Sequence, residues 1–308
     1  MPPDFHTRAY GKLLLTGEYF VLDGAVALAM PVRFGQTLEV RGASGHALQW
    51  RSLDDSGQPW FEATFSLPTL DIIDASDADT ARTLQSMLLA CRAQNPLFLN
   101  ENTGMEATTA VDFARHWGLG TSSTLIAALG RWADVDPYRV LADTLGGSGY
   151  DIACAYAEGP LLYQRGKTSP VVQPVDFRPV FSQNLWFVYL GKKQDSREGI
   201  RRYRALTKSL RPVLARVDRL TERCLSAATL SDFQQVLEEH EALVSNTLEL
   251  STVKSQYFSD FPGAVKSLGA WGGDFVLAAS AEPEAATRAY FRGKGMETVL
   301  GWGEMRGL

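Results

Sequence analysis

The sequence predicts an α+β fold, and two patterns along its 308 residues support this class. Further along the chain, helical and strand-like segments alternate, ending in the order strand, helix, helix, strand, helix, strand. The N-terminal third is instead rich in short apolar or alternating runs, which are typical of strands and occupy residues 12–15, 26–30, 36–41, 47–52 and 60–66. The change of texture places a domain boundary near residue 182, giving domains 1–182 and 183–308.

Apolar spacing and end signals predict the helices of the first half. Residues 78–93 repeat apolar side chains every three or four positions, and a dense apolar segment predicts a helix from Thr121 to Ala133. A third helix should begin with Asp136 as its N-cap and Pro137 at the first helical position.

The second half is predicted to open with a buried strand over residues 184–190. A long helix should follow over residues 197–225, where Pro212 should kink or split it. The next helix is predicted to start at Ser231, because Ser231 and Gln234 have the spacing of a capping box. Shorter elements are predicted at residues 161–164, 170–174, 275–279 and 296–300 as strands, and at 283–292 as a helix.

Composition narrows the class of protein. A net charge of −5 argues against a nucleic-acid partner, because such proteins carry a basic surface that neutralises phosphates. The 3 cysteines form no Cys-x-x-Cys pair and indicate reduced thiols. No apolar run is long enough to cross a membrane, and no signal peptide is visible at the start. We therefore expect a cytoplasmic protein that acts on a small molecule; its oligomeric state stays open, a homodimer included.

Four segments carry residues suited to chemistry. In the first, Lys12 and Glu18 flank an apolar Leu-Leu-Leu stretch. Opposite charges at the two ends of one buried strand could reach the same cleft. They could equally be solvated charges at strand ends.

The second segment, residues 117–124, places glycines and hydroxyls at a predicted helix start. Gly118 and Gly120 would let the backbone approach a ligand, and helix N-termini favour phosphate. An ordinary capped helix after a glycine turn is the alternative. The sequence lacks the Walker pattern and the third glycine of the dinucleotide fingerprint, which disfavours an oxidoreductase.

The third and fourth segments are also rich in glycine. Asp151 follows the turn Gly146–Gly149, where a carboxylate is costly to bury unless paired, and Lys12 would be a natural partner. Capping of the next segment is the alternative role. Gly269, Gly272 and Gly273 precede a buried strand and suit either a loop pressed against a ligand or an ordinary turn.

In this order the segments resemble the motifs of the GHMP kinase superfamily, which includes galactokinase, homoserine kinase, mevalonate kinase and phosphomevalonate kinase. Residues 12–22 look like the first motif, with Tyr10 where proline is usual. Residues 118–124 match the phosphate loop, 148–151 match Ser-Gly-x-Asp, and 266–276 match the third motif, with Trp271 where glycine is usual. The Gly-Tyr-Asp-Ile-Ala string, residues 149–153, is similar to a bacterial mevalonate kinase-like subgroup.

The resemblance implies a two-domain fold, ribosomal-S5-like and then ferredoxin-like, with ATP and substrate meeting in the cleft between the domains. It implies that Asp151 is the catalytic base and that Lys12 holds it ionised. Ser122 would also bind Mg²⁺. The ATP phosphates would be bound by Gly118, Leu119, Gly120, Thr121, Ser122 and Ser123, and the substrate by Glu18, Ser196, Gly272 and Gly273.

The implied activity is ATP-dependent phosphorylation of a hydroxyl of mevalonate or a related metabolite in isoprenoid precursor synthesis. Val140 stands where mevalonate kinases usually carry a glutamate that binds a second Mg²⁺. The turn Gly146–Gly149 looks more like that of phosphomevalonate kinase. The acceptor therefore stays open, and the alternatives are a phosphomevalonate kinase, a mevalonate-diphosphate decarboxylase-like enzyme, and a non-catalytic sensor that binds ATP or a metabolite.

Overall fold

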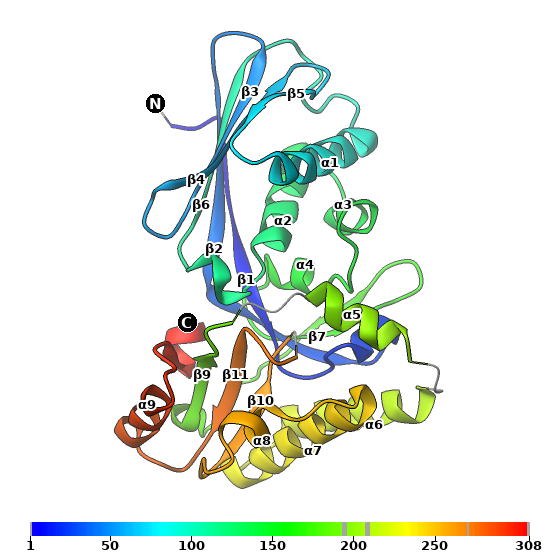
Figure 1. Ribbon diagram of the computed structural model, residues 1–308. Coiled ribbons are helices and arrows are strands. Elements are labelled where there is room, and N and C mark those ends of the chain that lie inside the picture. The colour runs from blue at the N-terminus through cyan, green and yellow to red at the C-terminus, as the bar shows by residue number, and fades with distance from the viewer. Residues whose placement is uncertain (1, 193–195, 207–209, 270, 307–308) are drawn as a thin grey trace. The chain divides into compact units, whose positions relative to one another are not determined.

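The computed structural model describes residues 2–192, 196–206, 210–269 and 271–306. The chain forms two compact units, and each draws on separate stretches of sequence (Figure 1). The first unit contains Met1–Gly11, Phe34–Arg115 and Leu119–Tyr156, and the second contains Lys12–Arg33, His116–Gly118 and Ala157–Leu308. The domain boundary near residue 182 refers to the two-domain organisation that the family resemblance implies, and it stays a prediction.

About 39% of the chain is helix and 26% is strand, which confirms the α+β class. The strands are β1 (Phe5–Leu14), β2 (Ala27–Gly42), β3 (Ala47–Leu53), β4 (Pro59–Ser66), β5 (Ile72–Ala75), β6 (Met105–Val111), β7 (Leu161–Gln164), β8 (Val171–Pro174), β9 (Leu185–Tyr189), β10 (Ala264–Ser267), β11 (Phe275–Ala279) and β12 (Val299–Gly301). The α-helices are α1 (Ala78–Gln94), α2 (Thr121–Ala133), α3 (Pro137–Asp143), α4 (Tyr150–Cys154), α5 (Ser196–Arg204), α6 (Arg211–Ser226), α7 (Leu230–Leu248), α8 (Val253–Tyr257), α9 (Glu284–Gly293) and α10 (Trp302–Arg306).

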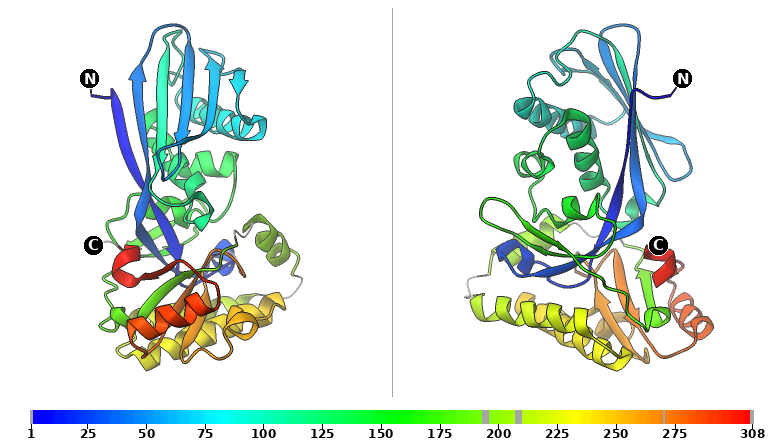
Figure 2. Two further views of the ribbon diagram at one scale, coloured as in Figure 1. Left: turned by 60° about the vertical axis from the view of Figure 1, so that its left-hand side comes forward. Right: turned by 180° about the vertical axis from the view of Figure 1, so that it is seen from behind.

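In the first unit, helices cover one face of a mixed sheet. The strand order is β5-β4-β3-β6-β2, in which β3 and β6 are parallel and the other neighbours antiparallel. Helices α1, α2 and α3 lie together on one face (Figures 1 and 2). Alternate residues of β3 and β4 point into this layer, and Trp50, Phe65 and Leu88 are among its buried side chains. Burial of this apolar face is the main driving force for the layer.

The second unit is built on an antiparallel sheet of order β10-β11-β9-β12. Helix α7 packs against β10 and lies beside α6 (Figures 1 and 2). Phe258 and Phe291 share a core cluster with Val276 of β11. The start of β2 also lies in this unit, where it pairs with β7, and β7 pairs with β8. Within the described residues, no helix has both the length and the apolar content needed to cross a bilayer.

Two helix predictions can be compared with the structure in detail. The helix predicted over residues 197–225 is split: α5 ends at Arg204, and α6 begins at Arg211 with Pro212 in its first turn, where a missing N–H does no harm. The predicted capping box at Ser231 is wrong. Thr229 is the N-cap of α7, because its extended backbone lets its hydroxyl accept the N–H of Asp232 at 3.1 Å.

Candidate active site

Helix α2 begins at a turn whose backbone favours glycine. Gly118 and Gly120 have φ of +69° and +96°, in the left-handed region that other residues rarely adopt. Gly120 is the N-cap and offers no capping side chain, so the first-turn N–H groups point toward the open end of the helix. Leu119 is buried, Thr121 is half-buried and Ser122 is exposed. This arrangement suits an anionic ligand.

Thr124 fastens the first turn of α2 to the sheet of the same unit. Its hydroxyl lies 2.7 Å from Oε1 of Gln36 on β2, and both side chains are buried. The hydroxyl also donates to the carbonyl of Thr121 at 2.9 Å. Thr124 therefore fixes the backbone of the first turn of α2, which carries Ser122.

Asp151 lies in the first turn of α4, directly after the turn Gly146–Gly149. Gly149 is the N-cap, with φ of +90°, and Asp151 is half-buried. The hydroxyl of Ser123 donates to Oδ2 of Asp151, and Oδ1 accepts the N–H of Ile152 at 3.1 Å. The structure thus brings together Ser123 of the predicted phosphate loop and the predicted base. The predicted pairing of Asp151 with Lys12 stays a prediction.

Lys12 belongs to the second unit, where it holds Gly118, the first residue of the predicted phosphate loop. Its Nζ donates to the carbonyl of Gly118 at 2.9 Å. A Cβ added at Gly118 would lie 2.2 Å from Cγ of Asp274, so the backbone is pressed against this carboxylate. Asp274 has φ of +53° and was not among the predicted site residues. Its place at the end of the glycine-rich segment was the only signal that could have found it.

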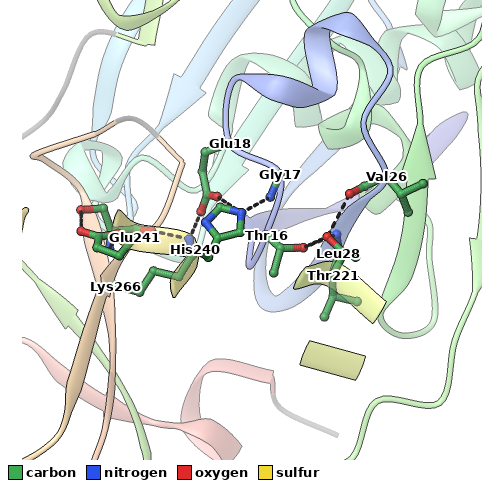
Figure 3. Close-up of polar contacts among 10 residues, drawn as sticks. Thr16, Gly17, Glu18, Val26, Leu28, Thr221, His240, Glu241 and Lys266 are labelled. Atoms are coloured by element: carbon green, nitrogen blue, oxygen red, sulfur yellow. Dashed lines mark hydrogen bonds and ion pairs between the residues drawn. The ribbon is translucent and has the colours of Figure 1, made fainter. Parts of the chain in front are cut away.

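Glu18 leads into a buried group of ionisable residues in the second unit, which Figure 3 shows. This ionic cluster consists of Glu18, His240, Glu241 and Lys266, and each of the four residues is at most 3% exposed. Nζ of Lys266 donates to Oε1 of Glu18 and, at 2.8 Å, to the carbonyl of Ser267. Glu241 accepts from the N–H and the hydroxyl of Ser267, both at 3.0 Å.

The ionic cluster has more acid than base. Nε2 of His240 accepts the N–H of Gly17 at 2.9 Å, and burial holds the pKa of His240 well below its usual range. The imidazole is therefore neutral, and its 3.5 Å approach to Oε2 of Glu18 is not an ion pair. Two carboxyls then face the single ammonium of Lys266. Burial raises the pKa of Glu18 and raises that of Glu241 to about 7, so the cluster retains a proton near neutral pH.

A second polar chain fixes the residues just before Glu18 (Figure 3). The hydroxyl of Thr16 lies 2.8 Å from that of Thr221 on α6 and accepts the N–H of Leu28 at 3.0 Å. Gly17 has φ of +89°, and a Cβ there would lie 2.7 Å from Cβ of Ala27. The segment from Thr16 to Glu18 is thus held on both sides. Sequence patterns identified only Glu18, since its partners lie more than two hundred residues away and are joined to it by folding.

The remaining predicted residues lie in α5 and before β11. Ser196 is the first residue of α5, and its side chain lies outside the described residues. Gly272 has φ of +84°, and a Cβ there would meet no described atom within 4 Å, so its backbone conformation rather than space requires glycine. Gly273 follows it in the same turn.

The polar groups at the start of α2 can be compared with the ligands that ATP phosphates and Mg²⁺ usually bind. The start of α2 offers uncapped N–H groups and the exposed hydroxyl of Ser122, which fit a phosphate chain. Within the described part of the chain, no three His, Cys, Asp or Glu side chains are grouped to hold a metal ion. Mg²⁺ prefers oxygen donors, keeps several waters and binds largely through nucleotide phosphates, so a few protein oxygens fit it.

Comparison with solved structures identifies the fold. No family model and no curated protein matches the sequence. The mevalonate kinase of Methanococcus jannaschii is 16% identical, with a TM-score of 0.69 over 96% of each chain. The Lin0012 protein of Listeria innocua is 15% identical, with a TM-score of 0.72 over 96% of each chain.

A third match is the Streptococcus pneumoniae phosphomevalonate kinase, solved with phosphomevalonate and AMPPNP. It is 15% identical, with a TM-score of 0.69 over 96% of this chain and 99% of that one. The chain therefore has the GHMP kinase fold, as the sequence motifs predicted.

Proposed function

We propose that the protein is a kinase that transfers the γ-phosphoryl group of ATP to a hydroxyl of a small metabolite, with Asp151 as the general base. One observation carries the proposal: the Asp151 carboxylate is hydrogen-bonded to Ser123, in the first turn of the helix whose glycine-rich start suits phosphates. A carboxylate and an anion site on one rigid frame are what phosphoryl transfer to an alcohol needs.

In the proposed reaction, the oxygen of the acceptor hydroxyl forms a bond to the γ-phosphorus, and Asp151 accepts the proton that this hydroxyl loses. The bond between the γ-phosphorus and the β,γ-bridging oxygen breaks, and ADP leaves with that electron pair. Ser123 fixes the direction in which the carboxylate points, because its hydroxyl occupies Oδ2. Such positioning contributes rate without any covalent intermediate on the protein.

The phosphate chain of ATP would bind the N–H groups that open helix α2, with Gly118, Leu119, Gly120 and Thr121 shaping the turn. Ser122 would bind Mg²⁺ together with nucleotide oxygens; the ion neutralises phosphate charge. Lys12 would add positive charge near the loop, since its ammonium is already fastened to Gly118.

The substrate side is proposed to involve Glu18, Ser196, Gly272 and Gly273. Glu18 would act by fixing the shape of its segment, because its carboxyl is buried against Lys266. Mevalonate is the first candidate acceptor and phosphomevalonate the second; the latter is supported by the glycine-rich turn before Asp151. We place the enzyme in the cytoplasm, in isoprenoid precursor synthesis.

The test is an ATP-consumption screen with Mg²⁺ against mevalonate, phosphomevalonate, homoserine and galactose, with products followed by ³¹P NMR. Turnover on one acceptor, lost in D151N, would support the proposal and name the substrate. Release of carbon dioxide from a diphosphorylated acid would indicate a decarboxylase instead. ATP binding without turnover on any acceptor would favour a sensor.

A further inference from the structure

Tyr19, which follows Glu18, has a backbone conformation that non-glycine residues seldom adopt. Its φ and ψ are 61° and −45°. Such conformations cost free energy and persist where the surroundings hold them, often at functional sites. Here the side chain supplies the hold: the buried Tyr19 hydroxyl accepts the backbone N–H of Trp271 at 2.9 Å.

Glu18 and Tyr19 both bind the glycine-rich segment. This segment consists of the described residues between Lys266 and Asp274. Glu18 is paired with Lys266, where the chain leaves β10. Tyr19 holds Trp271, further along the same segment. The Trp271 indole is buried and donates to the carbonyl of Ser251 at 3.3 Å. The segment that carries Gly272 is therefore fixed at separate points by two neighbouring residues.

Tyr19 also supports helix α5. Its ring stacks on Tyr203 of α5, with centroids 5.9 Å apart and planes 25° apart. On the previous turn of α5, a Cβ added at Gly199 would lie only 2.4 Å from the Tyr19 hydroxyl oxygen and 2.8 Å from Cε1. A side chain at position 199 would therefore displace the Tyr19 ring, because the helix backbone rests directly on the atom that holds Trp271.

The alternative is that Tyr19 only fills space between α5 and its surroundings. A space-filling ring would need neither a buried hydroxyl bonded to one backbone N–H nor a glycine facing that hydroxyl. Burial raises the pKa of Tyr19, so the phenol stays protonated while it accepts this bond. The geometry therefore favours a link in which the Tyr19 hydroxyl oxygen contacts both the backbone of α5 and the Trp271 N–H.

We propose that Tyr19 is a positioning residue that couples helix α5 to the glycine-rich segment, so that a displacement of either one is transmitted to the other. The role in catalysis rests on the proposed function, in which Gly272 and Gly273 lie at the substrate. Binding of a ligand against the segment would then also affect the position of α5, which carries the exposed Arg201. The coupling itself needs no assumption about the reaction.

The amide exchange of Trp271 tests the link directly. Selective ¹⁵N labelling of tryptophan leaves 7 backbone amides to resolve, and W271F assigns the relevant one. In Y19F, which removes only the hydroxyl, the Trp271 amide should exchange about five- to tenfold faster, the effect of losing one hydrogen bond. Y203F, which alters the stacked ring but not this bond, should leave the rate unchanged. Equal rates in Y19F and the parent protein would overturn the proposal.

G199A tests the coupling from the helix side. The added methyl group collides with the Tyr19 hydroxyl and should speed Trp271 exchange as Y19F does. In the Y19F background, G199A should not increase the exchange rate further, because the hydrogen bond from the Trp271 N–H is already absent. Additive effects of the two substitutions would show that α5 acts on the segment by another route and would overturn the coupling.

Titration with mevalonate and with phosphomevalonate, the two candidate acceptors, separates this inference from the proposed function. The parent protein and Y203F should bind alike, and Y19F several-fold more weakly, because fewer molecules hold the binding-competent segment. Equal binding by Y19F would restrict Tyr19 to a structural role and overturn its positioning role. Absence of binding in every variant would sink the proposed function, and the exchange rates measured without acceptor would still decide the coupling.

Discussion

At the scale of single residues, two carboxyls of this protein are held in opposite ways. Asp151 is half-buried, and its two side-chain oxygens accept hydrogen bonds from a hydroxyl and a backbone N–H, which fix the direction in which the side chain points. Glu241 is 3% exposed and shares the ammonium of Lys266 with Glu18, so burial favours its protonated form. The first arrangement suits a base, and the second suits a structural group.

D151N should lower kcat at least ~100-fold on the acceptor found by the screen, the usual contribution of a general base. Folding should be nearly unaffected, because the asparagine amide can still accept the N–H of Ile152 and donate to the Ser123 hydroxyl. The matched control is D143N, which neutralises an exposed carboxylate at the end of α3 and should leave kcat unchanged. Near-normal turnover of D151N would remove Asp151 as the base.

Glu241 should make stability fall as pH rises. Its pKa is raised from 4.5 to about 7 in the folded protein, so between these values the native state binds more protons than the unfolded chain. The resulting stabilisation is complete below pH 4.5 and is lost as pH rises to about 7. It corresponds to roughly 3 kcal/mol, at 1.36 kcal/mol per pKa unit.

Urea unfolding at pH 5 and pH 8 measures this effect against E241Q. Glutamine imitates the protonated acid, since its amide can still accept from the Ser267 N–H and donate to the Ser267 hydroxyl. The variant should lose less stability than the parent protein between the two pH values. Identical pH profiles would show that Glu241 does not carry this proton.

At the scale of elements, local signals explain which predictions held. Helix α2 was predicted with its observed bounds because its apolar residues and glycine start are contiguous in sequence. Strand β6 was not predicted. The residues on its buried side include alanine and threonine, so Met105–Val111 shows no clear alternation of apolar and polar side chains. Its parallel pairing with β3 depends on residues about sixty positions away, which no local pattern contains.

The correction at the start of α7 gives a test with a built-in control. T229A removes the hydroxyl that accepts the Asp232 N–H and should cost about 1 kcal/mol of unfolding free energy. S231A changes a neighbouring serine that the sequence had favoured as the cap, and it should have almost no effect. Thermal unfolding of both variants compares the two assignments; a larger loss in S231A would restore the original capping box.

At the scale of the whole molecule, the ion pair between Glu18 and Lys266 joins positions 248 residues apart. K266M should destabilise the protein by about 3–5 kcal/mol, because it leaves a buried carboxyl without its cation. The double variant E18Q/K266M should recover part of this lost stability, since it also removes the Glu18 carboxylate that K266M leaves without a partner.

The control for this prediction is an exposed ion pair of the same type. Lys254 and Glu238 are 3.0 Å apart, with 28% and 54% of their side chains exposed, and K254M should cost less than about 1 kcal/mol. Denaturant unfolding measures all three variants. A K266M protein as stable as K254M would mean that the ionic cluster is not desolvated in solution.

Local patterns along the chain predict the α+β class, the order of the main elements and the glycine-rich segments that resemble GHMP kinase motifs. These features depend on neighbours along the chain: apolar spacing, caps, and glycines where the backbone turns left-handed. The partners of the charged residues, in contrast, could be seen only in the folded chain. Ser123 on Asp151, Lys266 on Glu18 and Trp271 on Tyr19 are contacts between distant segments. Desolvation and hydrogen bonding at such contacts depend on burial, which arises only when the whole chain packs.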